Sequence, residues 1–287
     1  MKTRRHTSMA NRCVTLAIAF CGAFAAIARG GTLQTHAFES VTLRRTWQYT
    51  IYLPDGYDAA KAHYPVIYLL HGYGGTASDW ITQGGLQVTA DMLIKRHELA
   101  PVIMVMPEGG TDWYVDRKER IESAFFSDLI PEIESRYAVD ARREARAIGG
   151  VSMGGFGALR YALTRPELFC GALLLSPAIY AGVPPPSSAA RRAGVFGAPR
   201  FDPRAWQALN YPAVWNAYLR QPARVAMFVG VGNDDRPIAA DAQTLYARLR
   251  HAGNPARFTV LDGGHTWSVW RALLGPGLVS ALSCTAR

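Results

Sequence analysis

The segment Gly150-Val151-Ser152-Met153-Gly154 places a serine where its hydroxyl could act as a nucleophile. It fits the pattern G-x-S-x-G and lies between a short apolar run and a stretch rich in glycine and alanine, which is typical of a sharp turn between a strand and a helix. Such a turn strains the serine backbone and leaves no room for neighbouring side chains, a requirement that Gly150 and Gly154 meet. We therefore expect Ser152 to be a catalytic nucleophile.

His265 is the histidine best placed to act as the general base. A serine hydroxyl needs an adjacent base to become a good nucleophile. His265 lies in a glycine-flanked loop, Asp262 to Thr266, which follows a strand and precedes the last predicted helix. Of the seven histidines, it alone combines such a loop with a position after both other candidate residues. The chain order serine, acid, histidine is the one that accompanies this kind of serine turn.

Two adjacent carboxylates, Asp234 and Asp235, follow the apolar run Val225 to Val231. One of them would hold the imidazole in the required tautomer and stabilise its charged form, and the other would be a solvated turn residue. These residues by themselves favour neither carboxylate as the third member of a catalytic triad.

A second glycine-rich turn follows an apolar run at Tyr68 to Leu70 and reads His71-Gly72-Tyr73-Gly74-Gly75. In a serine hydrolase of this kind, such a turn supplies one backbone N–H to the oxyanion, and the residue after the nucleophile supplies another. We assign these amides to Tyr73 and Met153. His71 directly ends a strand, so we interpret it as a structural hydrogen-bonding residue and not as a base.

Short β-rich runs alternate with longer helical patterns along the chain. Phe38 to Leu53 predicts an opening antiparallel hairpin. The buried strands are predicted at Val66 to Leu70, Val102 to Met106, Ala145 to Gly149, Ala172 to Leu175 and Val225 to Val231. The helices are predicted at Leu86 to His97, Ile121 to Tyr137, Gly155 to Thr164, Ala239 to His251 and Ser268 to about Leu282. This order indicates an α/β fold with a mostly parallel twisted sheet between helices, and with the serine turn it predicts an α/β-hydrolase fold.

One long segment, residues 177–221, interrupts this alternation. It is rich in proline, alanine and arginine, and it contains no convincing strand. Connections of this length are uncommon unless they have a function or are disordered. Because the segment contains Trp206, Tyr211 and Trp215, we expect an ordered excursion that covers the carboxyl edge of the sheet.

The first 28 residues predict a cleavable signal peptide, because basic residues precede an apolar run that ends in Ala26-Ile27-Ala28. The run is too short to favour a membrane anchor, and no later stretch is long enough to span a membrane. We expect an exported protein, periplasmic or secreted, with residues 29–287 as a single catalytic domain. Cleavage would leave 27 basic and 22 acidic residues, a formal net charge of +5, and the dispersed arginines do not predict nucleic-acid binding.

Two cysteines, Cys170 and Cys284, would remain after cleavage. Cys170 begins an apolar run and is most simply interpreted as a small buried core residue, although an oxidising compartment would permit a bridge to Cys284. The chain has no C-x-x-C motif and no cluster of cysteine and histidine, so we expect neither a metal nor another cofactor.

Taken together, these motifs resemble the esterase family within the α/β hydrolases that includes S-formylglutathione hydrolases, feruloyl, acetylxylan, tributyrin-type and siderophore esterases, and mycolyltransferases. The similarity extends from about residue 37 to residue 280. It depends on Leu70 to Gly75 with Asp79-Trp80, Val105 to Gly110 with Trp113-Tyr114, Gly150 to Gly155, Gly232 to Asp235, and Gly263 to Trp267. In similar proteins the acid stands three residues after the turn glycine and about thirty before the histidine, which implies Asp235 and not Asp234. His71 and the predicted export both depart from eukaryotic-type S-formylglutathione hydrolases, which have serine at that position and look cytosolic.

The expected activity is hydrolysis of a carboxylic ester, on a small ester or an acylated sugar outside the cytoplasm, through an acyl-enzyme on Ser152. One alternative is an acyltransferase that passes the acyl group to a sugar or lipid alcohol with the same three residues. Another is a non-catalytic binding protein on the same scaffold. The absence of one of these three residues would indicate it. Aromatic residues near the motifs are expected to line the substrate pocket: Trp80, Trp113, Tyr114 and Trp267.

Overall fold

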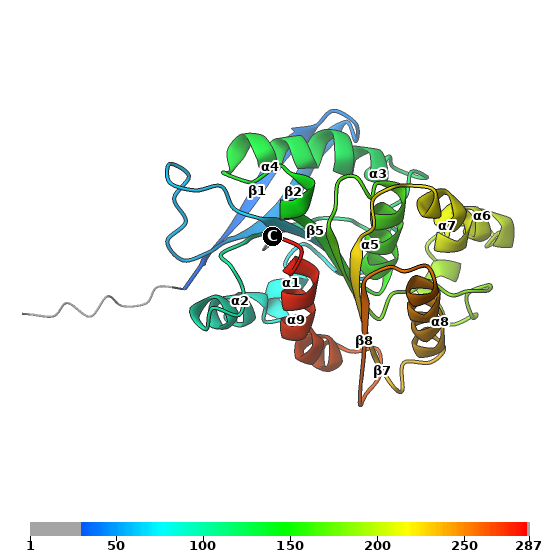
Figure 1. Cartoon of the computed structure of the whole chain (residues 1–287). Helices are drawn as coiled ribbons and strands as arrows, with labels where there is room; N and C mark the ends of the chain where they lie inside the picture. The colour runs from blue at the N-terminus through cyan, green and yellow to red at the C-terminus, as the bar shows by residue number, and fades with distance from the viewer. Residues whose placement is uncertain (1–29, 286–287) are drawn as a thin grey trace, which may run out of the picture.

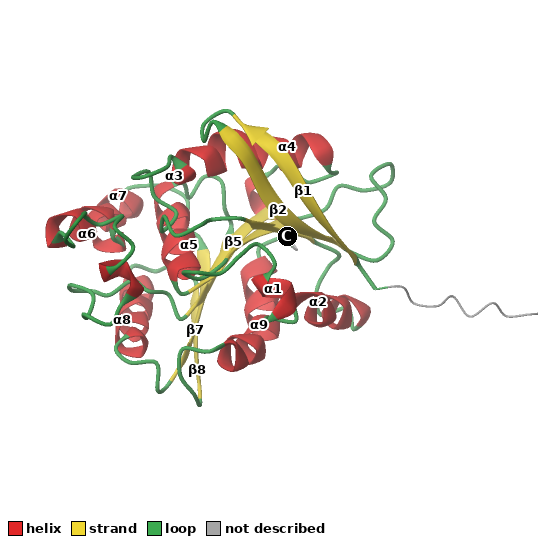
Figure 2. Ribbon diagram, turned by 180° about the vertical axis from the view of Figure 1, so that it is seen from behind, coloured by secondary structure: helices red, strands yellow, loops and turns green. Residues whose placement is uncertain are grey.

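The computed structural model describes residues 30–285, through which an eight-stranded sheet runs in the order β1-β2-β4-β3-β5-β6-β7-β8. The hairpin of β1 and β2 pairs antiparallel to β4, and all later neighbours are parallel (Figure 2). The strands are β1 (Thr32–Ser40), β2 (Arg45–Leu53), β3 (Val66–Leu70), β4 (Ile103–Pro107), β5 (Arg146–Val151), β6 (Gly171–Leu175), β7 (Ala226–Gly232) and β8 (Ala256–Leu261). The parallel strands therefore end at one common edge, where the loops that carry the candidate residues begin.

Helices cover both faces of this sheet (Figure 1). They are α1 (Asp79–Thr82), α2 (Leu86–Lys95), α3 (Ile121–Ala124), the π-helical turn η1 (Phe125–Leu129), α4 (Ile130–Arg136), the 3₁₀ turns η2 (Arg143–Ala145) and η3 (Ala189–Arg191), α5 (Met153–Thr164), α6 (Pro203–Leu209), α7 (Tyr211–Leu219), α8 (Ile238–His251) and α9 (Trp267–Leu282). One core lies between the sheet and α1, α2 and α9, and a larger one lies between the opposite face and α3, α4, α5, α7 and α8. These layers give the α/β-hydrolase architecture that the sequence predicts.

The predicted hairpin and buried strands are present, with ends that differ by a few residues at most apart from the start of the hairpin. The hairpin begins at Thr32, six residues earlier than the pattern indicates. The strand expected before His265 is β8, which is only partly buried because it forms the edge of the sheet. Long helical patterns predict α2, α5, α8 and α9 well, and Ile121 to Arg136 forms one continuous run through α3, η1 and α4.

The excursion over residues 177–221 contains two helices that its composition does not predict, α6 and α7. Each begins with a capping side chain followed by proline in the first turn: Asp202 accepts from the amide of Arg204, and Asn210 accepts from the amide of Tyr211. This combination is a recognised helix start, so the signal was present but hidden by the prolines. The buried Asn210 amide also donates to the carbonyls of Ile179 and Tyr180, which ties the start of α7 to the first residues of the excursion.

The predicted signal peptide, residues 1–28, lies outside the described residues. Between residues 30 and 285, no helix combines the length and the apolar character needed to cross a membrane.

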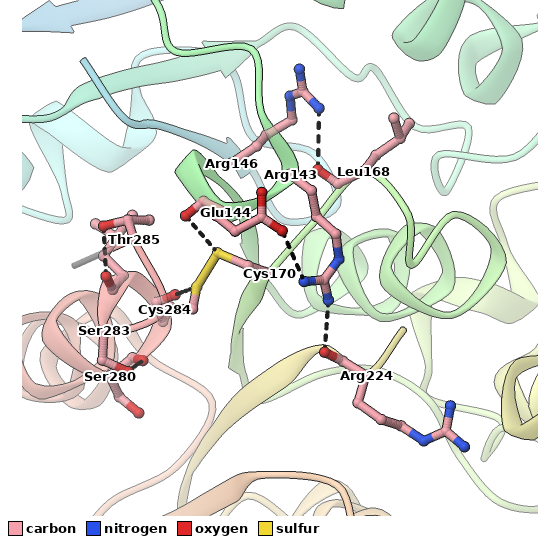
Figure 3. Close-up of a disulfide and its surroundings, with 12 residues drawn as sticks. Arg143, Glu144, Arg146, Leu168, Cys170, Arg224, Ser280, Ser283, Cys284 and Thr285 are labelled. Atoms are coloured by element: carbon pink, nitrogen blue, oxygen red, sulfur yellow. Dashed lines mark hydrogen bonds and ion pairs between the residues drawn. A yellow bond between two sulfur atoms is a disulfide. The ribbon is translucent and has the colours of Figure 1, made fainter. Parts of the chain in front are cut away.

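Cys170 and Cys284 form the disulfide that the sequence left open, and Cys170 is buried as expected (Figure 3). Cys170 immediately precedes β6, and Cys284 follows α9, which packs against the same face of β6 and β7. The two Cα atoms are 5.8 Å apart, although 114 residues separate them in the chain. The packing of α9 creates this proximity, and a short apolar sequence run cannot report it.

Removal of the disulfide is expected to lower stability and to leave activity at room temperature intact. Crosslinks that close loops of this length typically stabilise by about 2–5 kcal/mol, which for a chain of this size corresponds to a fall in Tm of roughly 5–15 °C. Thermal melts of a Cys170→Ala/Cys284→Ser double variant would measure it. A reductant should lower the Tm of the parent protein and not that of the variant; an equal fall in both would contradict the stabilising role.

Candidate active site

Three side chains from different loops meet at the carboxyl edge of the sheet. His265 Nε2 lies 2.8 Å from Ser152 Oγ, and His265 Nδ1 lies 2.8 Å from Asp235 Oδ2. The Asp235 side chain is buried, whereas Asp234 is exposed. The structure thus brings together Ser152, His265 and Asp235 and leaves Asp234 outside this hydrogen-bonded chain.

The turn at Ser152 has the strained backbone that the sequence pattern predicts. Ser152 has φ 54° and ψ −115°, a conformation that a residue with a side chain rarely adopts. A Cβ on Gly150 would lie 2.2 Å from the backbone of Gly154, and one on Gly154 would lie 2.1 Å from the carbonyl oxygen of Leu70. Glycine is therefore required at both positions so that β5 can turn sharply into α5 and present the hydroxyl.

Asn233 links the acid loop to the histidine loop. Its side-chain Nδ2 donates to Asp262 Oδ1 at 2.7 Å, and its side-chain Oδ1 accepts from the backbone amide of Gly263 at 3.0 Å. A Cβ on Gly232 would lie 2.2 Å from the carbonyl oxygen of Gly263, so the two loops are in close contact. These contacts fix the position of the Asp235 loop relative to the His265 loop. Sequence reasoning missed Asn233 because its partners lie thirty residues further along the chain.

Trp270 and Ser176 support the other side of His265. The Trp270 ring stands edge-on to the imidazole, with centroids 4.9 Å apart and planes at 90°. Trp270 Nε1–H donates to Ser176 Oγ at 2.9 Å, and both side chains are buried. Ser176 terminates β6 with φ 42°. The sequence offers no motif for this pair, since only the approach of α9 to β6 brings them together.

Breaking the Trp270–Ser176 hydrogen bond is expected to loosen His265. Ser176→Ala and Trp270→Phe should each lower kcat/KM by about three- to tenfold, as expected for one buried hydrogen bond. Because both variants remove the same bond, the double variant should be little worse than either single one in a double-mutant cycle. Fully additive losses would indicate that the two residues act independently of this bond.

Two backbone amides close to Ser152 along the chain or in space have no protein hydrogen-bond acceptor within the described residues. Within residues 30–285, neither the N–H of Tyr73 nor that of Met153 donates to a protein acceptor. Met153 opens α5, so the positive end of the helix dipole also points to this place. A Cβ on Gly72 would lie 3.6 Å from Ser152 Cβ, which puts the Tyr73 loop beside the serine. The arrangement can hold a developing oxyanion next to Ser152.

A cavity of about 570 Å³ opens over Ser152 and His265. Trp267, Tyr180 and serines of the excursion line it, and Trp113 borders it with a side chain that is almost fully buried. Trp80 and Tyr114 do not. Trp80 is buried beneath Trp267, and Tyr114 is buried with its hydroxyl donating to the carbonyl oxygen of His71. We predicted that both residues contact the substrate, and the structure instead places them in the core, where they support the cavity wall. Burial raises the pKa of the Tyr180 phenol, so Tyr180 stays protonated.

The family described as "Putative esterase" matches residues 40–280 of this chain. The chain belongs to this esterase family. An esterase of Mycobacterium tuberculosis is 31% identical over 247 residues, which cover 76% of this chain and 52% of that protein. An endo-1,4-beta-xylanase/feruloyl esterase of Xylanibacter ruminicola is 32% identical over 160 residues, or 52% of this chain and 22% of that protein. The chain therefore spans about half or less of the length of these relatives.

Among solved structures, a ferulic acid esterase superposes with a TM-score of 0.74 at 28% sequence identity and covers 89% of this chain and 99% of its own. An acetyl esterase of Caldicellulosiruptor saccharolyticus is 26% identical over 231 residues, covering 74% of this chain and 81% of that protein. These comparisons agree with the fold and the family expected from the motifs.

Proposed function

We propose that this protein is a serine esterase that hydrolyses carboxylic esters through an acyl-enzyme on Ser152. The observation that carries the proposal is the continuous chain of hydrogen bonds from Ser152 Oγ through His265 to the buried Asp235, at the base of an open cavity. A hydroxyl, an imidazole and a carboxylate in this order form a nucleophile, a general base and an orienting acid.

In the proposed reaction, Ser152 Oγ attacks the ester carbonyl while His265 Nε2 takes the hydroxyl proton. The carbonyl oxygen becomes an oxyanion that accepts hydrogen bonds from the amides of Tyr73 and Met153. The intermediate collapses, the C–O bond to the alcohol breaks, and His265 returns the proton to the leaving alcohol. Water then attacks the acyl-enzyme with His265 again as base, and the acid is released with Ser152 restored. Asp235 keeps the proton of the imidazole on Nδ1 throughout.

We propose that the substrates are sugars esterified with an aromatic acid or with acetic acid. The cavity joins apolar walls from Trp113, Trp267 and Trp270 to polar groups such as Gln83, Ser187 and Ser188. Relatives named as feruloyl and acetyl esterases support the same class. Export remains part of the proposal and is supported by the Cys170–Cys284 disulfide, since disulfides persist in oxidising compartments.

A graded ester panel tests this proposal. Purified protein is given p-nitrophenyl acetate, butyrate and octanoate, methyl ferulate, an acetylated xylo-oligosaccharide and a thioester. We expect measurable kcat/KM on the short and aromatic oxygen esters, and release of free acid. Product analysis with a sugar alcohol in excess distinguishes hydrolysis from acyl transfer: an acylated sugar as the main product would favour the transferase, and no turnover of any ester would reject both activities.

A further inference from the structure

His71 is a fully buried histidine that no step of the proposed reaction uses. Its Nδ1 lies 2.8 Å from the carbonyl oxygen of Gly72, and its Nε2 lies 2.8 Å from the amide nitrogen of Gly109. A backbone N–H can only donate, so Nε2 accepts and Nδ1 carries the proton. Glu108 Oε1 is also 3.3 Å from Nε2, but the shorter contact assigns the lone pair to the Gly109 amide. The ring is therefore a neutral imidazole that donates to Gly72.

The carbonyl that His71 holds belongs to the same peptide unit as the N–H of Tyr73. This unit is planar and trans, so its C=O and N–H bonds point in opposite directions and rotate together. The Gly72 oxygen accepts from His71 Nδ1 and from the Gly75 amide, the latter at 3.0 Å. Two donors on this one oxygen restrain the rotation of the peptide plane, and so they restrain the direction in which the Tyr73 N–H points.

Glu108 braces the same turn from the end of β4. One carboxylate oxygen accepts from the amide of Ala77 at 3.2 Å, and the other accepts from the amide of Gly110 at 3.1 Å. Glu108 therefore links the loop after β3 to the loop after β4 through these two amides.

We propose that His71 and Glu108 are positioning residues that aim the Tyr73 N–H at the oxyanion. The inference rests on the proposed function and deepens it, because it assigns the oxyanion geometry to a buried imidazole and not to the glycine turn alone. Neither side chain needs to touch the substrate. Loss of the positioning should therefore reduce stabilisation of the transition state and leave binding of the ground-state ester largely unchanged.

Two substitutions at His71 distinguish the roles of its two ring nitrogens. His71→Asn retains an N–H donor near the position of Nδ1, whereas His71→Gln retains a polar group near Nε2 only. Removal of a whole oxyanion donor typically costs about 10²- to 10³-fold in kcat. We expect His71→Gln to lower kcat by about 30- to 100-fold with KM changed less than about threefold, and His71→Asn to stay within about tenfold of the parent. The exposed His63 supplies a matched control, and His63→Asn should change neither constant.

Affinity for a transition-state analogue gives a readout that a merely structural role would not move. An alkylboronic acid that adds to Ser152 places a negatively charged oxygen at the Tyr73 amide, so its Kd should rise in proportion to the loss of kcat/KM across the variants. If His71→Gln does not fold, Glu108→Gln provides the same test, with an expected loss of about tenfold in kcat and in analogue affinity. Unchanged kcat in whichever of these two variants folds, or reduced kcat with unchanged analogue affinity, would overturn the inference.

The outcome also separates this inference from the proposed function. If the parent protein hydrolyses none of the esters and Ser152 is not labelled by a fluorophosphonate, the proposed function fails. If the parent is active and labelled while His71→Gln keeps full kcat, only the positioning role fails.

Discussion

Replacement of Ser152 by alanine is expected to lower kcat on p-nitrophenyl acetate by roughly 10⁴- to 10⁶-fold. The reason is that the variant retains the cavity and the oxyanion amides but has no oxygen that can form the acyl-enzyme. Esterase rates of the purified variant, with Tm and circular dichroism as measures of folding, test this. Ser152 ends β5 in a turn made by Gly150 and Gly154, and alanine fits there without added bulk, so the fold should persist.

His265→Ala should cost about as much as Ser152→Ala, and the double variant should be little worse than either, because the two residues act as one unit. A fluorophosphonate should label the parent protein and not Ser152→Ala. If Ser152→Ala kept the parent activity, the nucleophile would lie elsewhere. If the parent protein were folded but neither labelled nor active, a non-catalytic binding protein on this scaffold would be the better interpretation.

Asp235→Asn is expected to lower kcat by about 10⁴-fold. Asp235 Oδ2 accepts a hydrogen bond from the N–H at His265 Nδ1, which keeps that proton on Nδ1 and leaves Nε2 free to accept the Ser152 proton. An asparagine amide can present N–H to Nδ1 instead, which selects the tautomer whose Nε2 already holds a proton and cannot act as a base. Steady-state kinetics on the same ester measure the loss, and KM should change little.

Asp234→Asn is the matched control, since it makes the same chemical change one residue away. Asp234 is exposed, and its side chain makes no hydrogen bond or ion pair with any of residues 30–285. Its kcat should therefore remain within about twofold of the parent value. A large loss in Asp234→Asn together with a mild one in Asp235→Asn would reverse the assignment of the acid.

The fold was predictable because its signals are local. Fully buried parallel strands such as β3 and β4 appear as short apolar runs, and α8 shows the periodicity of a helix with one buried face. The excursion was harder to interpret, because the prolines that suggest an irregular segment stand in the first turns of α6 and α7. Its order depends on contacts about thirty residues apart within the segment, such as those of Asn210 with the carbonyls of Ile179 and Tyr180.

The residues that line the cavity were only partly predictable, for a related reason. Trp267 lines the cavity and the almost fully buried Trp113 borders it, whereas Trp80 and Tyr114 do not reach it, although all four are aromatic residues near glycine-containing turns. A side chain's type and sequence neighbours do not report its distance from the cavity surface. The edge-to-face packing of Trp267 over Trp80 determines which of that pair is exposed to a ligand.

The sequence alone indicated the esterase family and the α/β-hydrolase fold, and it supplied Ser152 and His265 as the proposed nucleophile and base, because glycine spacing and chain order encode these features locally. The tertiary structure placed Asp235, which the family resemblance had implied, in direct contact with His265. It alone paired Cys170 with Cys284 and brought Trp270, Ser176 and His71 into supporting positions. Each of these outcomes depends on which loops adjoin at the edges of a parallel sheet. That adjacency is created by strand order and helix packing, and no short stretch of the chain contains it.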